Sequence, residues 1–226
     1  MTQLAYNYRH FSPEDYHFES FEGLASGDRY QDATVYTMDG RSVRLSDYLK
    51  DKPLVLETGS MTCPMYAQSV PPMKKLIEKY PQLDFVLLYV REAHPGERLS
   101  AHQNQQEKLI AAKKSEKSHK EDRVTLVDDV RGSAHKFYGA MPNSIYVIDP
   151  DGTILYRSIW NNAPEIEAVL GQLAQGQQVI SRDLNPVPPF SIGAIRTLLM
   201  GGFVALWDFA IGLPRLIANH KEVGNM

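Results

Sequence analysis

The sequence predicts an α/β protein in which a mixed β-sheet is covered by helices on both faces. The apolar run 84–90 has no helical period, which is typical of a central strand buried on both sides. Two turn pairs, Asp39-Gly40 and Asp151-Gly152, favour tight β-hairpins. Helical stretches separate the central strands, so a parallel crossover is followed by a hairpin, and the sheet must contain both strand directions.

The first half of the chain supplies a helix start, a hairpin and a strand–helix unit. Ser12-Pro13 followed by two acids is typical of a helix start, and Pro64 suits a first helical turn because its missing N–H costs nothing there. Pro71-Pro72 is expected to kink that helix. These signals predict a helix start at 12–15, strands at 33–38 and 42–45, a brief helix at 46–49, a strand at 54–57 and a helix from 64 to about 80.

The second half continues with alternating helices and strands. Ala163-Pro164-Glu165 suits the first turn of the last domain helix. The expected elements are a helix from about 99 to 117, a strand at 124–127, a short helix at 132–138, hairpin strands at 145–148 and 153–159, and a helix from 163 to about 174. This order is the thioredoxin-like architecture with an added N-terminal β-hairpin.

Two appendages flank the predicted domain, which we place at residues 31–178. Residues 1–30 form an N-terminal arm, and residues 179–226 comprise a proline-rich linker at 182–189 and an apolar helical extension. The uncharged core of the extension is shorter than the ~20 residues that span a bilayer as a helix. We expect the apolar stretch 190–217 to pack on its own domain or on a second copy in a homodimer, with attachment to a membrane surface as the next alternative.

Charge and cysteine content argue against several classes of protein. With 24 basic and 27 acidic residues, the chain has no excess of positive charge for binding nucleic acid. A single cysteine excludes an intramolecular disulfide, and the seven scattered histidines give no spacing typical of metal ligands. The first residues contain no apolar signal region, so we expect a cytoplasmic protein.

The one cysteine, Cys63, follows a predicted strand and precedes Pro64 at a predicted helix start. Free N–H groups and the helix dipole at such a junction favour the thiolate, which is the nucleophilic form. In the thioredoxin architecture a cis-proline loop faces the cysteine, and Met141-Pro142 is expected to supply it. The sequence therefore predicts an accessible, acidic thiol, against the alternative of an inert cysteine in the core.

Four blocks of the sequence resemble the iodothyronine deiodinase family in order and spacing. They extend from about residue 50 to residue 175, a little over half of the chain, and the Glu-Ala-His loop is the most distinctive of them. The blocks are Lys52-Pro53-Leu54-Val55-Leu56, Gly59-Ser60-Met61-Thr62-Cys63-Pro64, Asp84-Phe85 through Glu92-Ala93-His94, and Met141-Pro142 with Ile145-Tyr146-Val147-Ile148.

The resemblance implies a thioredoxin-fold oxidoreductase that removes iodine reductively from an iodinated aromatic compound, as thyroxine deiodinases do. It implies that Cys63 is the nucleophile, in the place where most members carry selenocysteine. It also implies that His94 handles the proton beside the substrate's phenol, with Glu92 orienting or charging the imidazole. No cofactor is expected to be bound, and the small-molecule substrate is reduced with an external thiol of thioredoxin or glutathione type. We further expect the substrate site to include Thr62, Tyr66, Pro142 and Ser144.

The chain departs from the family after Pro142, where Asn143-Ser144 replace an acid and an arginine that grips the substrate's carboxylate. This departure puts iodothyronine itself in doubt as the substrate. Two other functions stay open: a one-cysteine peroxiredoxin-like enzyme whose Cys63 thiolate reduces a hydroperoxide, and a non-catalytic thioredoxin-fold module that binds a partner through its apolar extension. Disulfide exchange is disfavoured because Tyr66 stands where a resolving cysteine belongs.

Overall fold

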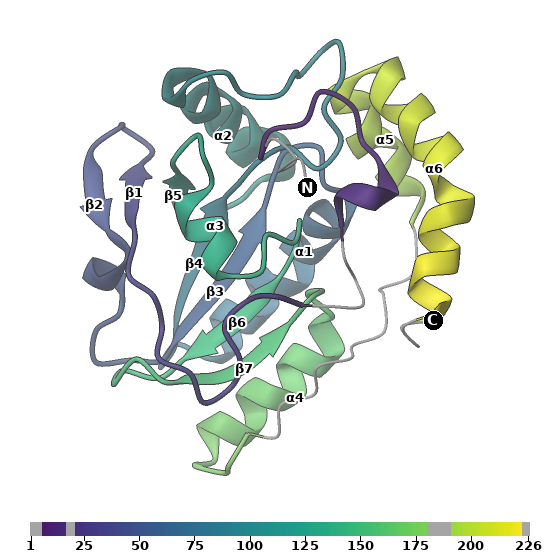
Figure 1. Ribbon diagram of the computed structural model, residues 1–226. Helices are drawn as coiled ribbons and strands as arrows, with labels where there is room; N and C mark the ends of the chain where they lie inside the picture. The colour runs from purple at the N-terminus through teal and green to yellow at the C-terminus, as the bar shows by residue number, and fades with distance from the viewer. Residues whose placement is uncertain (1–5, 17–20, 180–190, 223–226) are drawn as a thin grey trace.

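The computed structural model describes residues 6–16, 21–179 and 191–222, and a seven-stranded sheet forms its centre (Figure 1). The strand order is β2-β1-β5-β4-β3-β6-β7. The strands are β1 (Thr34–Thr37), β2 (Ser42–Arg44), β3 (Leu54–Gly59), β4 (Asp84–Tyr89), β5 (Val124–Asp128), β6 (Ile145–Ile148) and β7 (Ile154–Ser158). β3, β4 and β5 run parallel to one another, and the β1–β2 and β6–β7 hairpins pair antiparallel with them at the two sides. The predicted mixed sheet and both predicted hairpins are confirmed.

Helices cover both faces of this sheet, as the sequence predicted. The described α-helices are α1 (Pro64–Lys79), α2 (Gln105–His119), α3 (Ser133–Phe137), α4 (Ala163–Ala174), α5 (Ile192–Gly201) and α6 (Phe203–Glu222), with 3-10 turns at Pro13–Asp15 and Leu45–Tyr48. α1 and α4 pack on one face, where Met73 and Ile166 meet Val55 and Phe85 of the sheet. α3 packs on the opposite face (Figure 1). The sheet is therefore enclosed, and most residues of its parallel strands are buried.

α2 begins at Gln105 rather than near Leu99, where the sequence placed it. The side chain of Asn104 accepts the N–H of Glu107 at 2.9 Å and thereby caps the helix. The amides of Arg98 and Leu99 instead donate to the carbonyl oxygen of Gly201, at 2.9 and 3.4 Å. The residues before α2 are therefore a loop that is bonded to the C-terminal extension.

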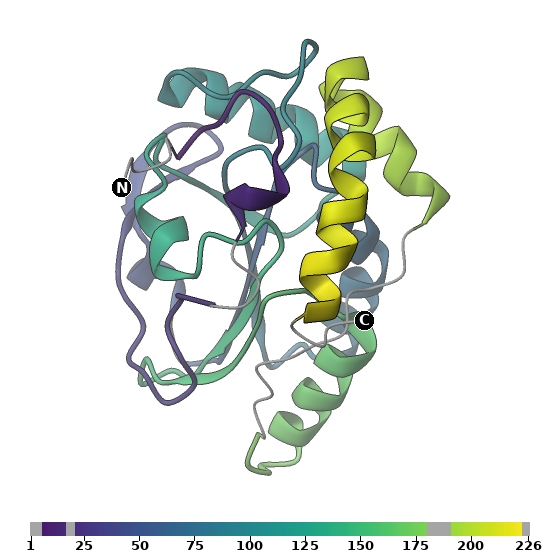
Figure 2. The same ribbon diagram turned by 45° about the vertical axis from the view of Figure 1, so that its right-hand side comes forward.

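The N-terminal arm and the extension pack against each other on one side of the domain (Figures 1 and 2). Their contact is an apolar cluster, called here the arm–extension cluster, that consists of Phe11, Tyr16, Met141, Ile159, Trp160, Leu198 and Phe209. Gly212 on α6 permits the close approach, because a Cβ at this position would lie only 3.0 Å from Pro13. The inner face of the extension thus packs on its own domain, while the predicted linker at 182–189 lies outside the described residues.

The corner between α5 and α6 is fixed to the loop that follows β4. A Cβ on Gly201 would lie 2.4 Å from the carbonyl oxygen of His94 and 3.3 Å from Cγ2 of Thr62. The carboxylate of Glu97 accepts the N–H groups of Phe203 at 2.6 Å and Val204 at 3.0 Å, and these hydrogen bonds cap the start of α6. The extension is therefore seated directly on the segment that carries His94.

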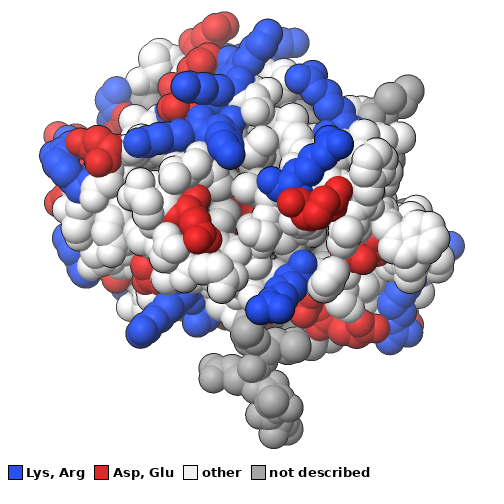
Figure 3. Space-filling view, turned by 90° about the horizontal axis from the view of Figure 1, so that it is seen from above, with Lys and Arg blue, Asp and Glu red and all other residues white. Residues whose placement is uncertain are grey.

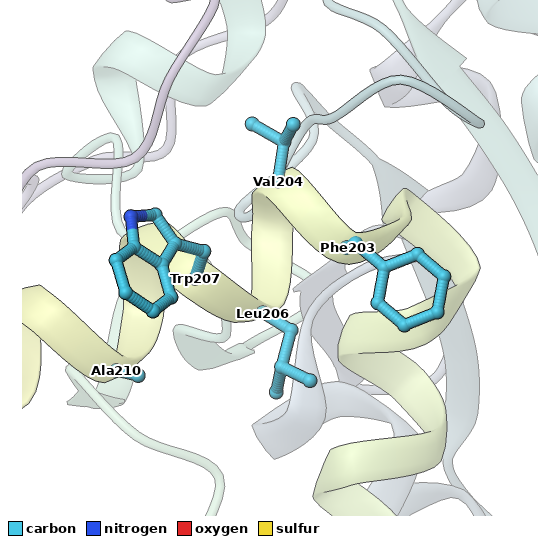
Figure 4. Close-up of a pocket in the computed structure, with 5 residues that line it drawn as sticks. All are labelled: Phe203, Val204, Leu206, Trp207 and Ala210. Atoms are coloured by element: carbon cyan, nitrogen blue, oxygen red, sulfur yellow. The ribbon is translucent and has the colours of Figure 1, made fainter.

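The outer face of α6 is apolar and exposed. Phe203, Trp207 and Ile211 follow one another at one-turn spacing and are 66%, 67% and 62% exposed. A shallow pocket of about 510 Å³ opens on this face (Figure 4), and it is lined by Phe203, Val204, Leu206, Trp207 and Ala210. Among the described residues, no helix combines the length and the apolar character needed to cross a bilayer.

The charged side chains do not form a field of one sign on the face seen from above. Figure 3 shows lysine and arginine interspersed with aspartate and glutamate there, with broad uncharged areas between them. This face has no basic stripe of the kind that binds a nucleic-acid backbone.

Gly201→Ala is expected to loosen α5 and α6 from the domain. The added Cβ would meet the carbonyl oxygen of His94 at 2.4 Å, and backbone cannot yield as a flexible side chain does. Hydrogen–deuterium exchange should become faster in both helices, and the melting temperature should fall. Gly193→Ala on the same helix is the control, since its Cβ would meet only Oγ of Ser191 at 3.5 Å. Equal exchange in the two variants would contradict this account of the docking.

Candidate active site

Cys63 lies at the junction of β3 and α1, where the sequence placed it, and it is the N-cap residue of α1. Its Sγ accepts the N–H of Tyr66 at 3.4 Å. The side chain packs among Tyr66, Val70, Leu87 and Ala93 and is only 1% exposed. The thiol is therefore sealed from solvent in this structure.

The protonation state of this thiol differs from the prediction. Burial raises the pKa of Cys63 to about 12, the N–H groups of Tyr66 and Met65 lower it, and the carboxylates of Glu57 and Glu92 raise it further. The predicted accessible and acidic thiol is therefore wrong for the structure as it stands, because the loss of water outweighs the favourable helix terminus. A nucleophilic Cys63 requires that water or a substrate first reaches the sulfur.

Glu92 is a buried carboxylate that holds the loop before Cys63. Its Oε2 accepts the N–H of Thr62 at 2.9 Å and the hydroxyl of Thr62 at 2.7 Å. Its Oε1 accepts the hydroxyl of Tyr89 and lies 3.3 Å from Nε2 of His102. Burial raises the pKa of Glu92, but the nearby imidazole of His102 and the hydrogen bonds from Tyr89 and Thr62 outweigh burial and lower the pKa below its ordinary value. The carboxylate is thus ionised at neutral pH.

His94 is joined to this carboxylate through Thr62 and not directly. The N–H of His94 donates to Oγ1 of Thr62 at 3.0 Å, so Thr62 bridges the two loops, and no described hydrogen bond links it to the sulfur. The imidazole packs against the rings of Phe11 and Phe209, at centroid distances of 4.3 and 5.4 Å, and these two rings also contact each other at 6.3 Å. Burial lowers the pKa of His94 to about 3, while Glu92 raises it. The imidazole is therefore neutral at pH 7, and Glu92 positions the loop instead of contacting the ring.

The loop at Met141-Pro142 is buried but differs from the expected geometry. No cis peptide bond occurs in the described residues, so the prediction of a cis-proline is wrong. The carbonyl oxygen of Met141 accepts the hydroxyl of Thr58 at 3.0 Å and lies 2.7 Å from Nε2 of His135. These two contacts, and not a cis bond, fix the path of the chain into Pro142.

Ser144 and Tyr66, which we expected in the substrate site, have internal partners. The hydroxyl of Ser144 lies 3.0 Å from that of Thr58 and donates to the carbonyl oxygen of Tyr138 at 3.2 Å. The hydroxyl of Tyr66 donates to Glu121 at 3.1 Å. Both side chains are fully buried, so a contact with substrate stays a prediction that requires the site to open.

A buried charged network beneath Cys63 was not predicted. Arg123 pairs with Glu57 on β3 and with Glu121, and all three side chains are almost fully buried. Glu57 also accepts hydrogen bonds from Ser69 at 2.6 Å and from Asn143 at 2.7 Å. Glu57, the acid that directly follows the apolar residues 54–56 in a predicted strand, was the signal that could have revealed it. The aromatic neighbours of His94 were also missed, because they lie far from it in sequence.

The fold and the position of the cysteine define the class of protein. A thiol:disulfide interchange protein DsbE from Chlorobium tepidum superposes with a TM-score of 0.53 at 20% identity, over 68% of this chain and 98% of that one. The thioredoxin domain of a thiol-disulfide oxidoreductase from Bacteroides vulgatus gives 0.50 at 16% identity, over 66% and 99%. The chain thus has a thioredoxin-like fold, with its only cysteine at the β3–α1 junction.

The family follows from the sequence comparison. The profile of the iodothyronine deiodinase family matches residues 11–172, and the chain belongs to this family. Thyroxine 5-deiodinase of Sus scrofa is 28% identical over 149 residues, which are 61% of this chain and 48% of that protein. Type II iodothyronine deiodinase of Bos taurus is 33% identical over 104 residues, or 40% and 38%. The chain therefore spans about half the length of the first of these relatives.

Glu92→Gln is expected to destabilise the fold by about 1–3 kcal/mol, the usual effect of disturbing a buried hydrogen-bonded group. Because the folded-state pKa of Glu92 is lowered, its charge stabilises the protein above the ordinary value of 4.5, and this contribution is lost as the pH falls through the folded-state pKa. Urea unfolding of wild type and variant should therefore differ most near pH 7 and converge in acid. Glu78→Gln, exposed on α1, is the control and should not change the pH dependence.

Proposed function

We propose that the chain is a thiol-dependent oxidoreductase that reductively removes iodine from iodinated aromatic compounds. Cys63 is the nucleophile, and an external thiol of thioredoxin or glutathione type is the reductant. The observation that carries this proposal is the family match across 11–172, a region that includes Cys63, Glu92 and His94. Thr62, the residue before Cys63, is hydrogen-bonded to both Glu92 and His94. The names thyroxine 5-deiodinase and type II iodothyronine deiodinase of two relatives support the reaction class.

The proposed reaction balances with two external thiols. The proton of the Cys63 thiol passes to His94, the thiolate attacks iodine, and the carbon–iodine bond breaks while a sulfur–iodine bond forms. The ring carbon takes the proton from His94, which leaves the dehalogenated ring and a sulfenyl iodide. One external thiol then displaces iodide and forms a mixed disulfide, and a second thiol releases Cys63 with formation of the external disulfide. The two thiols are oxidised, and the carbon–iodine bond is reduced.

The loop after Pro142 supports a substrate without an amino-acid carboxylate. Nδ2 of Asn143 donates to Glu57 at 2.7 Å and to the carbonyl oxygen of Thr58 at 3.1 Å. Ser144 is likewise bonded inside the fold, so this loop offers no cation to grip a carboxylate. We therefore propose iodinated phenols as the substrate class.

Iodide release from 2-iodophenol with dithiothreitol as reductant tests the reaction. Wild type should release iodide with turnover, and Cys63→Ser should lose more than about 10³-fold in rate, as other enzymes do on loss of a covalent nucleophile. Phe137→Ala, on the surface of α3, is the control and should retain the wild-type rate. Consumption of hydrogen peroxide by wild type without iodide release would contradict the proposal and favour the peroxiredoxin-like alternative.

His94→Gln is expected to lower the rate of iodide release by about 10²–10⁴-fold, the usual contribution of a general acid–base group. The pH dependence of the rate that arises from ionisation of the His94 imidazole during turnover should disappear. Melting curves separate this role from a structural one, because a defect in proton transfer does not require a loss of stability. A folded variant that keeps the shape of the wild-type pH–rate profile would contradict a role in proton transfer.

A further inference from the structure

The imidazole of His94 lies in an aromatic slot, lined on adjacent sides by two rings of the appendages whose centroids are 6.3 Å apart. Phe11, in the N-terminal arm, approaches the imidazole with a centroid distance of 4.3 Å and an interplanar angle of 50°. Phe209, on α6, meets its edge at 5.4 Å and 84°. His94 itself belongs to the loop after β4. The sheet domain therefore supplies the imidazole, and the arm and the extension supply the rings that cover it.

One ring nitrogen of His94 lacks a hydrogen bond in this slot. Its Nδ1 has no hydrogen-bond partner among the described residues, although His94 is only 7% exposed. Buried polar side-chain atoms are nearly always paired, and an exception calls for an explanation. A ligand that carries both a ring and a hydroxyl group would keep the stacking contact and would supply the missing hydrogen bond.

The segment around Phe11 is attached to α6 by contacts that a ligand could replace. His10 pairs with Asp208 at 3.0 Å, but His10 is 68% exposed, and exposed ion pairs stabilise little. Phe11 and Pro13 lie against the bare backbone of Gly212. Closer to the N-terminus the arm is held more firmly, because Tyr8 donates its hydroxyl to the carbonyl oxygen of Ala93 at 2.9 Å.

We propose that the ring of Phe11 occupies the place that the substrate's aromatic ring takes on His94, and that substrate binding displaces residues 9–13. This inference rests on the proposed function. It identifies residues 9–13 as a gate over the site and accounts for a preference for aromatic ligands. A ring replaces a ring, so an aromatic ligand restores the stacking that the displacement removes, whereas an aliphatic ligand does not. Met65 packs both against the arm–extension cluster and against the cluster around Cys63, so displacement of the arm would also loosen the cover of the sulfur.

Two variants weaken the proposed gate without altering Cys63 or His94. Phe11→Ala removes the ring, and Gly212→Val places a side chain where Pro13 and Phe11 now lie within 3.0–3.2 Å of a Cβ. Each should speed alkylation of Cys63 by iodoacetamide about two- to tenfold, the equilibrium factor of one lost aromatic pair. Phe137→Ala, 42% exposed on α3, should leave the rate unchanged. Melting curves show whether each variant is folded.

The unmodified chain provides the second test, which holds even if both variants fail to fold. Saturating 2-iodophenol should speed hydrogen–deuterium exchange in residues 9–13, because these residues leave the slot when the ring binds. Cyclohexanol at the same concentration should not, since it cannot stack on the imidazole. Unchanged exchange with 2-iodophenol, or an equal effect of cyclohexanol, would overturn the proposal.

The outcomes for the gate and for the reaction can be told apart. Faster alkylation in both variants, with ring-dependent exchange but no iodide release from any phenol, would support the gate and overturn the proposed function. Iodide release by wild type, with folded variants that are alkylated at the wild-type rate, would support the function and overturn the gate. Stronger binding of 2-iodophenol to Phe11→Ala than to wild type would support the gate, and weaker binding would count against it.

Discussion

The candidate site depends on one interaction, the hydrogen bonding of the buried Glu92 carboxylate to Thr62. Taking a carboxylate out of water is costly unless its oxygens are paired, and here Thr62, Tyr89 and His102 surround both of them. The same Thr62 hydroxyl accepts the N–H of His94. One residue therefore fixes the cysteine loop and the histidine loop relative to each other, and the corner at Gly201 packs on both.

The framework that positions the thiol also opposes its ionisation. Glu92 and Glu57 are the two carboxylates that raise the pKa of Cys63, and burial raises it more than either. Glu57 is neutralised in part by Arg123, and this pairing reduces the repulsion between an acid and a thiolate in the same region. The rigid placement and the unreactive state of the sulfur thus have a common origin, which is a densely packed and water-free environment.

The elements that follow local rules could be predicted from the sequence. The β1–β2 and β6–β7 hairpins follow from Asp-Gly turn pairs between apolar segments, and α1 follows from Pro64 after a buried strand. The start of α2 was predicted too early, because the prediction did not recognise Asn104 as the residue that caps the helix. The predicted position of Cys63 at a strand–helix junction is confirmed, but the predicted low pKa of its thiol is not. A helix terminus can be recognised in a sequence, whereas the burial of a side chain cannot.

The contacts that close the site could not be predicted, because they join distant parts of the chain. Phe11 and Phe209 meet at His94 only after the arm and the extension have docked. Neither residue belongs to the four sequence blocks on which the resemblance was based, although the family profile begins at residue 11. Sequence reasoning could say that the apolar stretch 190–217 must bury a face, but not that this face would cover the candidate site.

Closure and ionisation are therefore coupled in this protein. A thiol that is buried beside two carboxylates gains acidity when water enters, because hydration stabilises the charged form of Cys63 and weakens the influence of Glu57 and Glu92. The same entry of water favours the charged form of His94, whose pKa burial now lowers to about 3. Entry of water thus lowers the pKa of Cys63 and raises the pKa of His94, so proton transfer from the sulfur to the imidazole becomes easier. A substrate that opens the cover would then activate its own nucleophile, and in its absence the thiol is protonated and shielded from oxidants.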